Sequence, residues 1–518
     1  GDEALDGSAG RSHHLLNPTL KALGRRLRLA VVGGSYGFIG PVHRVASRID
    51  DRFEIVAGVL SSDTQRGAAA ASDIGINPGR AYATVQEMLA AERNRPDGAE
   101  VVAIMTPNAF HFDACMAALA AGMHVICDKP LTTNLADALR LAEMVKSSGL
   151  VFCLTHNYSG YPLVRQARAM VAGGELGEIR IVQVEYAQDW LADALEDTGQ
   201  KQASWRTDPA QAGPAGCLGD IGTHAAQLAE FVTGMSPIEL SADVHTFVPG
   251  RLVDDHVQVQ LRYANGARGL LWASQVACGE ENHLRLRVYG TRGALHWDQE
   301  QPNEMTFQPA GQPARRLTRG MACLPPSAAQ ATRTPGGPPE GSLEAFAQIY
   351  RDFAEDVRDA QQGRAHASQP TRVPGLADGV PSLSFVEAVL RSGAANAAWS
   401  RMGCAAPWAH PRFGRNICLP RCAPGVPRPG VGHPWTPHLT GWPQHRRRSG
   451  RHRPGLHLEP RTDQKNRRSP GRRGQAQRRT RAVGPHGQPA SHRAERAQLR
   501  VPFRRPLAVV RTGGGLRA

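Results

Sequence analysis

The chain has 518 residues, enough for two to four domains, and a net charge of +15. The charge is unevenly spread: residues 403–518 form a tail with 25 basic and three acidic side chains, and the remaining body carries about −7. The nine cysteines are odd in number and lack CxxC spacing, so neither a disulfide framework nor a metal site is expected, and free thiols suit a reducing cytoplasm. No run of eighteen apolar residues predicts a membrane span, and residues 1–20 lack the apolar core of a secretory signal.

The first structured segment after a polar arm (residues 1–25) is an apolar strand over residues 27–32, followed by a glycine-rich turn and a helix over residues 42–49. Glycines allow a pyrophosphate to approach the backbone, and the helix terminus offers amide donors. Because Ser35 stands where the first glycine of a strict GxGxxG would fall, the pattern alone is a weak signal. Its place after the first strand favours cofactor binding by Gly33, Gly34, Ser35, Tyr36, Gly37, Phe38 and Ile39.

The second strand, over residues 53–60, brings the candidate ribose-binding residues about twenty positions later. An acidic residue there would bind the ribose hydroxyls of NAD, as Asp63 is placed to do. Ser61, Ser62 and Arg66 equally suit the 2′-phosphate of NADP. Both cofactors therefore remain open.

Two further strands, over residues 101–105 and 124–127, end in polar motifs at the edge where parallel sheets bind ligands. Lys129 follows the second of them directly, and Pro130 fixes the turn that presents it. Helices over residues 109–121 and 135–148 and a strand over 151–155 complete a doubly wound Rossmann domain of residues 26–155. These motifs add the cofactor-binding candidates Thr106, Pro107, Asn108, His111, Asp128 and Lys129.

Residues 156–402 change to alternating, β-branched segments, which predict an α+β domain with a large, mainly antiparallel sheet and helices on one face. We expect strands over residues 179–187, 238–247, 257–263, 269–276, 284–289 and 294–298. Asn265-Gly266 predicts a hairpin turn between two of them. Residues 308–341 are expected to form a loop, and helices are expected over residues 163–172, 343–359 and 383–400.

A helix in this domain opens with Asp220 and His224, which are four residues apart and so share a face. A carboxylate beside an imidazole orients it and stabilises its charged form, as a general acid or base requires. An isolated pair of this kind is more often an N-cap aspartate near a surface histidine. Candidate substrate contacts, each equally compatible with a structural role, are His156, Asn157, Tyr158, Trp205 and Arg206, beside Lys129, Asp220 and His224.

Several separated motifs, in order, resemble the Gfo/Idh/MocA family (glucose–fructose oxidoreductase, inositol dehydrogenase and rhizopine catabolism proteins) over residues 26–400. The motifs are Gly33 to Gly40, Thr106 to His111, Gly122 to Pro130 and Gly219 to His224, with Trp205-Arg206 and the segments at Ser274-Gln275 and Glu281-Asn282. The resemblance makes Lys129 the lysine of the family's E-K-P motif, here with Asp128 in place of glutamate. It also assigns Asp220 and His224 to the family's D-x-x-x-H pair.

The resemblance implies an enzyme that transfers a hydride between NAD or NADP and a secondary alcohol of a sugar, sugar derivative or inositol. His224 would be the base, steadied by Asp220, and Lys129 would stabilise the developing alkoxide. Alternatives are a dihydrodiol- or bilin-type reductase, or a dinucleotide-sensing regulator, although a regulator has no need of proton-transfer groups. A homo-dimer or homo-tetramer is expected, formed through a broad sheet face of Val, Leu and Trp residues.

The tail over residues 403–518 has no helical or strand period and cannot bury enough apolar surface to fold. One interpretation is a disordered segment that binds nucleic acid non-specifically through its charge. The Arg/Pro/Gly/His mixture and the abrupt change where the resemblance stops favour a non-native or frameshifted extension.

Overall fold

The computed structural model describes residues 17–322, 324–364 and 372–403. The first element is helix α1 (Pro18–Leu23), which begins where the Asn17 side chain accepts a hydrogen bond from the amide of Leu20. Part of the arm expected over residues 1–25 is therefore helical, and residues 1–16 lie outside the described residues. The expected basic tail also lies outside them, apart from Gly403.

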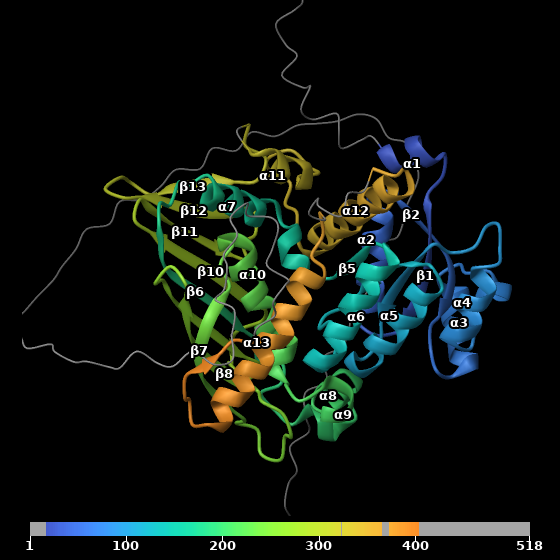
Figure 1. The fold of residues 1–518 in the computed structure, drawn as a ribbon, viewed down its shortest axis with the longest axis horizontal. Helices are drawn as coiled ribbons and strands as arrows, with labels where there is room; N and C mark the ends of the chain where they lie inside the picture. Colours follow the sequence, from blue (N-terminus) through green and yellow to red (C-terminus); the bar gives the residue numbers. More distant parts are fainter. Residues whose placement is uncertain (1–16, 323, 365–371, 404–518) are drawn as a thin grey trace, which may run out of the picture. The chain divides into compact units, whose positions relative to one another are not determined.

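The first sheet consists of five parallel strands in the order β2-β1-β3-β4-β5 (Figure 1). Its strands are β1 (Leu27–Gly33), β2 (Phe53–Val59), β3 (Val101–Met105), β4 (His124–Cys127) and β5 (Phe152–Leu154). All five begin and end within one residue of the predicted positions. The strand order reverses between β1 and β3, which is where a doubly wound sheet binds its ligand.

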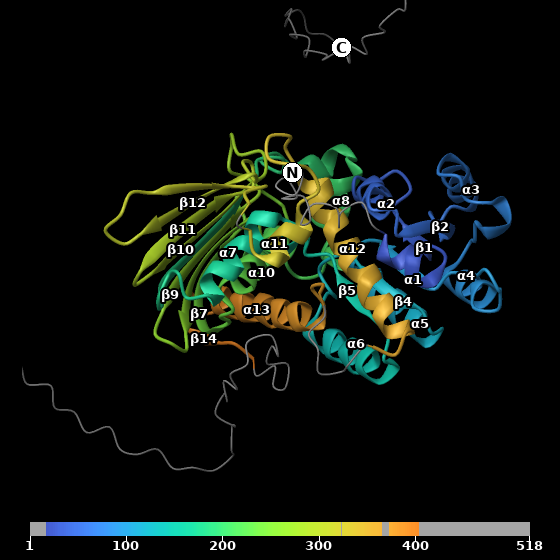
Figure 2. The same cartoon turned by 90° about the horizontal axis from the view of Figure 1, so that it is seen from above.

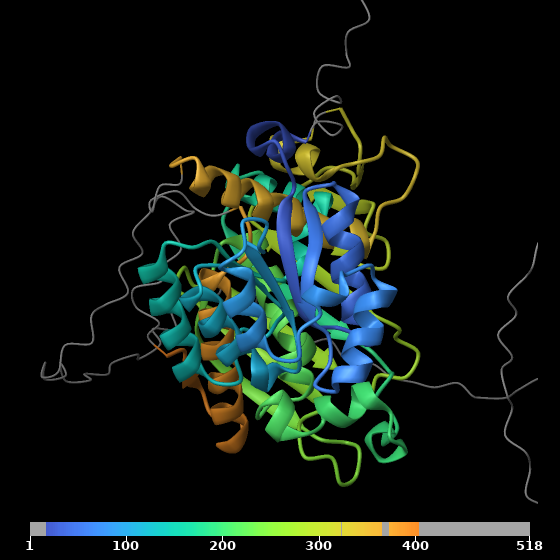
Figure 3. The same ribbon diagram turned by 90° about the vertical axis from the view of Figure 1, so that its right-hand side faces the viewer.

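Helices cover both faces of this sheet (Figure 3): α2 (Ile39–Ile49), α3 (Thr64–Asp73), α4 (Val85–Glu92), α5 (His111–Ala120) and α6 (Leu135–Ser148). Alternate residues of the strands face opposite sides, so Val101 and Ala103 belong to one buried cluster and Val102 and Ile104 to another. Helix α12 (Ser342–Gln361) packs into the first of these clusters, although it follows the second sheet in sequence. The division at residue 155 stays a prediction, and α12 completes the dinucleotide domain's core from beyond it.

The second sheet has nine strands in the order β13-β12-β11-β10-β6-β9-β8-β7-β14. Only β6 and β9 pair in parallel among its described strands, and the other pairs are antiparallel. The predicted hairpin forms at Asn265-Gly266, where Gly266 has a φ of 87°. The strands are β6 (Ile179–Ala187), β7 (Pro237–His245), β8 (His256–Tyr263), β9 (Arg268–Ser274), β10 (His283–Gly290), β11 (Gly293–Asp298), β12 (Glu304–Pro309), β13 (Arg315–Thr318) and β14 (Ser400–Arg401).

Helices α7 (Pro162–Ala172), α10 (Thr223–Thr233) and α13 (Leu376–Ala394) lie against one face of this sheet, as Figure 2 shows. One buried cluster, which includes Leu228, Leu271 and Phe385, joins the helices to the strands. The predicted fold, a Rossmann domain followed by an α+β domain, is confirmed.

The loop predicted over residues 308–341 is wrong in part, because it contains β13, the end of β12 and helix α11 (Pro326–Ala331). β13 is a four-residue edge strand held by its pairing with β12, and two of its residues are arginines. Such a strand carries no apolar alternation to detect. Helix α13 also begins and ends earlier than predicted, and the chain then returns to the sheet as β14.

Candidate active site

The glycine turn after β1 packs so closely that side chains are excluded from it. Gly33 and Gly34 both have positive φ, and a Cβ on Gly34 would lie 2.4 Å from the sulfur of Met105. A Cβ on Gly40 would lie 1.9 Å from the Gly34 carbonyl oxygen. The turn therefore leaves open backbone at the start of α2, a cradle that fits the pyrophosphate of a dinucleotide.

The segment after β2 uses part of its polar atoms internally. Asp63 caps α3, because its Oδ1 accepts a hydrogen bond of 2.8 Å from the amide of Arg66. The hydroxyl of Ser61 accepts from the Asp63 amide at 3.2 Å. The Arg66 guanidinium lies over the Tyr36 ring at 5.2 Å. One Asp63 oxygen and the Arg66–Tyr36 stack remain available to the adenosine end of a cofactor.

Two of the predicted cofactor residues after β3 are engaged inside the protein. Nδ2 of Asn108 donates a hydrogen bond of 2.9 Å to the carbonyl of Ala212, on the second domain. The fully buried ring of His111 lies between two carbonyl oxygens, 2.8 Å from that of Pro130 and 2.9 Å from that of Thr106. These side chains hold the surrounding loops in place, whereas the hydroxyl of Thr106 is buried without a hydrogen-bond partner among the described residues.

Lys129 leaves the sheet at the end of β4 on a turn fixed by Asp128. Oδ1 of Asp128 accepts hydrogen bonds from the Lys129 amide at 3.0 Å and from the Thr155 hydroxyl at 2.6 Å. The shortened acid of the D-K-P motif is therefore held by Thr155, the residue that follows the neighbouring strand β5. Nζ of Lys129 crosses to the second domain, where it donates to the carboxylate of Asp220 at 2.6 Å and also to its carbonyl oxygen.

Asp220 lies in a π-helical turn, η6 (Leu218–Gly222), immediately before α10. Its Oδ2 accepts from Nε2 of Gln275 at 2.9 Å and lies 3.4 Å from Nε of Arg206. Burial alone would raise the pKa of Asp220, but the charges of Lys129 and Arg206 and the hydrogen bonds from Lys129 and Gln275 hold it well below its usual range. The carboxylate is therefore charged throughout the neutral pH range.

The expected orientation of His224 by Asp220 is not what the structure shows. No hydrogen bond joins these two described side chains, and the π-helical turn directs the carboxylate to Lys129 instead. The imidazole of His224 lies edge-on to the rings of Tyr158, at 4.9 Å, and His156, at 5.4 Å. Burial, with the nearby Lys129 and His156, lowers the pKa of His224 well below its usual value, so the ring is neutral.

His156 lies just after β5, and both of its ring nitrogens are buried without a hydrogen-bond partner. The same holds for Nδ1 of His224. Burial lowers the pKa of His156 to about 4. Buried polar atoms in native proteins are nearly always satisfied, by protein, water or a ligand. Two neutral imidazoles with unused nitrogens beside Lys129 therefore mark the place where a polar ligand fits. Asn157, half-buried, begins the adjoining turn η4 (Asn157–Gly160).

Helix α8 (Lys201–Arg206) carries Trp205 and Arg206 to the same place. The Arg206 guanidinium lies over the Trp205 ring at 4.2 Å and 5.8 Å from that of Trp190. The structure thus gathers Lys129, Asp220, His224, His156 and Arg206, while it places Asn108 and His111 in supporting positions.

Residues missed by the sequence analysis are Gln188 and Tyr186, which extend the polar network. Nε2 of Gln188 donates to Asn282 at 2.7 Å, and the Tyr186 hydroxyl donates to the same oxygen at 2.8 Å. Gln188 and Gln275 each follow the last residue of parallel neighbours, since Ala187 pairs with Ser274. The available signal was a polar amide directly after the strand predicted over residues 179–187, whereas Gln275 lies inside the strand predicted over residues 269–276 and follows the observed strand, which ends at Ser274.

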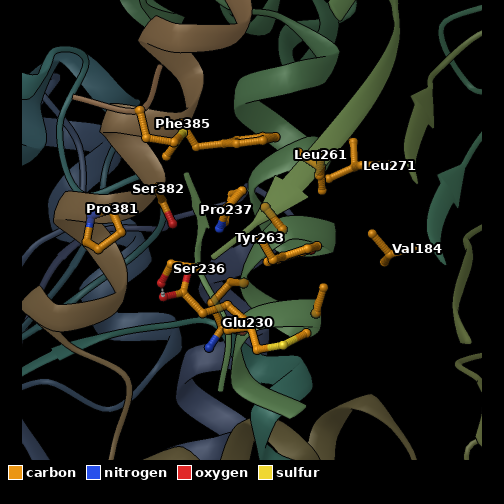
Figure 4. Close-up of a pocket in the computed structure, with 15 residues that line it drawn as sticks. Val184, Glu230, Ser236, Pro237, Leu261, Tyr263, Leu271, Pro381, Ser382 and Phe385 are labelled. Carbon is orange, nitrogen blue, oxygen red and sulfur yellow. Dashed lines mark hydrogen bonds between the residues drawn. The ribbon is translucent and has the colours of Figure 1, made fainter. Parts of the chain in front are cut away.

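A separate cavity lies between α10, α13 and strands β7 and β8 (Figure 4). Its volume of about 30 Å³ holds one or two water molecules and no sugar. It contains Glu230, whose pKa burial raises to about 7 and whose carboxylate accepts a hydrogen bond from Ser236. This cavity is not the substrate site.

No cluster of three or more potential ligands in the described part of the chain is arranged to hold a metal ion. In residues 17–322, 324–364 and 372–403, no helix has both the length and the apolar character that a membrane span needs.

Comparison with known proteins agrees with this fold. The oxidoreductase family with an NAD-binding Rossmann fold matches residues 27–156, and the Gfo/Idh/MocA C-terminal domain matches residues 164–296. The uncharacterized oxidoreductase YfiI of Bacillus subtilis is 33% identical over 386 residues, which cover 73% of this chain and 98% of that protein.

Two solved structures each cover 73% of this chain. An inositol dehydrogenase homolog from Azotobacter vinelandii, complexed with NAD+, is 37% identical, with 97% of it covered and a TM-score of 0.71. A levoglucosan dehydrogenase complexed with NADH and levoglucosan is 26% identical, with all of it covered and a TM-score of 0.62. The chain therefore belongs to the Gfo/Idh/MocA family of oxidoreductases, and its first domain is an NAD-binding Rossmann domain.

Proposed function

We propose that the protein is a dehydrogenase that transfers a hydride between a nicotinamide cofactor and a secondary alcohol of a sugar, sugar derivative or inositol. The observation that carries this is the meeting of Lys129 with Asp220, beside the neutral rings of His224 and His156, at the carboxyl end of the Rossmann strands. The names of the inositol dehydrogenase homolog and the levoglucosan dehydrogenase support a polyol or sugar substrate.

Lys129 would bind the reacting hydroxyl and stabilise the alkoxide that forms as the proton leaves. Its ammonium group is held by two oxygens of Asp220, and its side chain is 14% exposed. A fixed cation in a site that excludes most water stabilises developing negative charge strongly. Asp220 is thus a positioning residue for Lys129, and Gln275 and Arg206 fix Asp220 in turn.

His224 would accept the hydroxyl proton. Only a neutral imidazole acts as a base, and burial keeps this one neutral. A base with a lowered pKa is weak. Lys129 would offset this weakness, because the substrate hydroxyl that it binds becomes more acidic and gives up its proton to His224 more readily. His156, edge-on at 5.4 Å, supplies a second neutral ring whose nitrogens suit neighbouring hydroxyl groups.

When bound, the nicotinamide ring accepts or returns the hydride. The residues that would hold the cofactor are the glycine turn, Gly33 to Ile39, the Ser61–Arg66 segment, Thr106 and Pro107. The amide and hydroxyl network of Gln188, Gln275, Asn282 and Tyr186 offers the several hydrogen-bonding groups that a ring with many hydroxyls requires.

We also propose that two copies associate through the open face of the second sheet. The face predicted to carry Val, Leu and Trp is in fact mixed. Ile181 and Leu270 are 45% and 41% exposed, and Glu185 pairs across the strands with both Trp272 and Arg285. Apolar groups among paired charges suit a specific interface. A Leu270→Arg variant should lower the mass measured by light scattering, and a wild-type monomer at micromolar concentration would contradict the assembly.

The substrate assignment is tested with the purified chain, NAD+ and NADP+, and a panel of polyols, hexoses, anhydrosugars and trans-dihydrodiols. Formation of reduced nicotinamide is followed by absorbance. We expect turnover with at least one polyol or sugar, and none with Lys129→Ala, whose NADH affinity should be unchanged. Turnover of a dihydrodiol alone would refute the substrate class, and normal turnover by Lys129→Ala would refute the site.

A further inference from the structure

Helix α8 of the second domain reaches the glycine turn of the first domain. Nε2 of Gln202, on that helix, lies 3.4 Å from the point that a Cβ on Gly37 would occupy. Apart from Gly37 itself and its two chain neighbours, no other heavy atom of the described residues comes within 4 Å of that point. An amide from the substrate-binding half of the chain therefore lies directly over the phosphate cradle.

Arg206 fixes which end of this amide faces the turn. Oε1 of Gln202 accepts a hydrogen bond of 2.5 Å from Nη1 of Arg206, one helical turn further on. Because a guanidinium only donates, the partner atom must be the amide oxygen, and the NH2 group must point away from it. That group makes no hydrogen bond to any residue in the described part of the chain.

From this geometry we propose that Gln202 is a cofactor-binding residue, which donates from Nε2 to a pyrophosphate oxygen of the dinucleotide. The turn supplies backbone donors from one side, and Gln202 supplies a side-chain donor from the other. This inference rests on the NAD-binding domain and not on the substrate class, so it stands or falls separately from the proposed activity.

The contact also has a consequence for the chemistry. Arg206 holds Gln202 through Nη1, and its Nε lies 3.4 Å from Oδ2 of Asp220, whose Oδ1 accepts from Lys129. A continuous line of polar side chains therefore connects the phosphate cradle with the lysine at the reacting hydroxyl. Cofactor binding that draws on Gln202 would also restrain Arg206 and so the Asp220–Lys129 pair.

The test measures binding by the full chain with three ligands that differ in one part each: NADH, ADP-ribose, which has the pyrophosphate without nicotinamide, and AMP, which has no pyrophosphate. A hydrogen bond to a charged phosphate predicts that Gln202→Ala weakens NADH and ADP-ribose at least about tenfold. AMP should bind within about twofold of wild type. Gln202→Glu, which places a negative charge at the same point, should weaken NADH more than Gln202→Ala does.

Gln211→Ala is the matched control. Gln211 lies on the adjacent helix α9 (Pro209–Ala212), its amide donates at 2.8 Å to the N-cap residue Asp208, and none of its atoms lies within 4 Å of the Cβ point on Gly37. This variant should bind all three ligands as wild type does. Wild-type affinity of Gln202→Ala for ADP-ribose would overturn the proposal. An equal loss for AMP would also overturn it, because the effect would then not arise at the pyrophosphate.

Discussion

Replacing Asp220 by asparagine keeps the shape of the side chain and removes its charge. The carboxylate holds Lys129 at 2.6 Å, whereas it makes no hydrogen bond to His224 among the described residues. Removing one partner of a buried ion pair costs about 3–5 kcal/mol, and the 14% and 20% exposure of these two side chains reduces our expectation to about 2–4 kcal/mol of unfolding free energy.

Removing the other partner of the ion pair, by Lys129→Met, should lower the free energy of unfolding by less. Asp220 then keeps its hydrogen bond from Gln275 and its ion pair with Arg206, so we expect a loss of about 1–2 kcal/mol. The double variant should lose less than the sum, with a coupling energy of about 1–3 kcal/mol, as for other residues in contact. The same cycle with Asp220→Asn and His224→Gln should give a coupling below about 0.5 kcal/mol.

The assay is urea unfolding without cofactor, followed by tryptophan fluorescence and circular dichroism, with slopes compared to confirm the same transition. The two cycles share the Asp220→Asn protein, so each serves as the other's control. A coupling above about 1 kcal/mol between Asp220 and His224, with additive effects of Asp220 and Lys129, would refute the assignment of Asp220 to Lys129.

Four further outcomes are expected. His224→Ala should lower kcat by about 10²–10⁴ without changing the NADH Kd. If kcat of the wild type fell on the acid side with a midpoint at or above pH 6.5, and this variant removed that fall, the result would contradict an imidazole kept neutral by burial. Burial opposes the charged form of His111, but Cys127, Asp128 and the Pro130 carbonyl outweigh burial and raise the pKa of this ring to about 9. The protonated ring therefore stabilises the folded protein fully below pH 6.5, and this contribution is lost as the pH rises through 9. His111→Gln should remove that slope from unfolding free energies measured between pH 6 and 10. Burial raises the pKa of Glu230 to about 7, so the wild-type protein loses stability as the pH rises from 4.5 to 7 and the buried carboxyl group must ionise. Glu230→Gln should therefore be more stable than wild type by about 1–2 kcal/mol in urea unfolding at pH 8, and an equal or lower stability there would contradict this. A chain ending at Gly403 should match the full chain in Tm and kcat/KM, because the amide of Met402 already donates a hydrogen bond to the carbonyl of Ile238 and so attaches the end of the described chain to the second sheet. An insoluble or inactive truncated protein would show that later residues are needed.

The sequence predicted the strands of the first sheet because each is a short, mainly apolar run bounded by turn residues. Lys129 was found for the same reason, since its place is fixed by the end of β4. The partner of Asp220 was not predictable from spacing. A four-residue interval implies that Asp220 and His224 share a helical face, but the π-helical turn at Leu218–Gly222 breaks that rule locally.

Tertiary contacts, within the first domain and between the domains, were also beyond the sequence. Asn108 and His111 follow a strand end, as a cofactor-binding residue would, and only the fold brings the Ala212 and Pro130 carbonyls to them. Gln202 lies on the same short helix as Trp205-Arg206 but outside that motif, and its proposed role depends on a turn 165 positions earlier in the chain. Residues whose partners are fixed by tertiary packing leave no periodic trace.

The site separates charged from neutral groups, and that separation decides how a hydroxyl placed between them would react. Lys129, Asp220 and Arg206 form a charged cluster in which the carboxylate is shared by two cations. His224 and His156 face it as neutral rings, because burial and the same lysine oppose their protonation. A cation on one side favours the alkoxide, and an uncharged imidazole on the other can receive the proton. Had the Asp220 carboxylate pointed at His224, it would have favoured the imidazolium and left Lys129 unheld, so the turn that directs it to the lysine serves both groups.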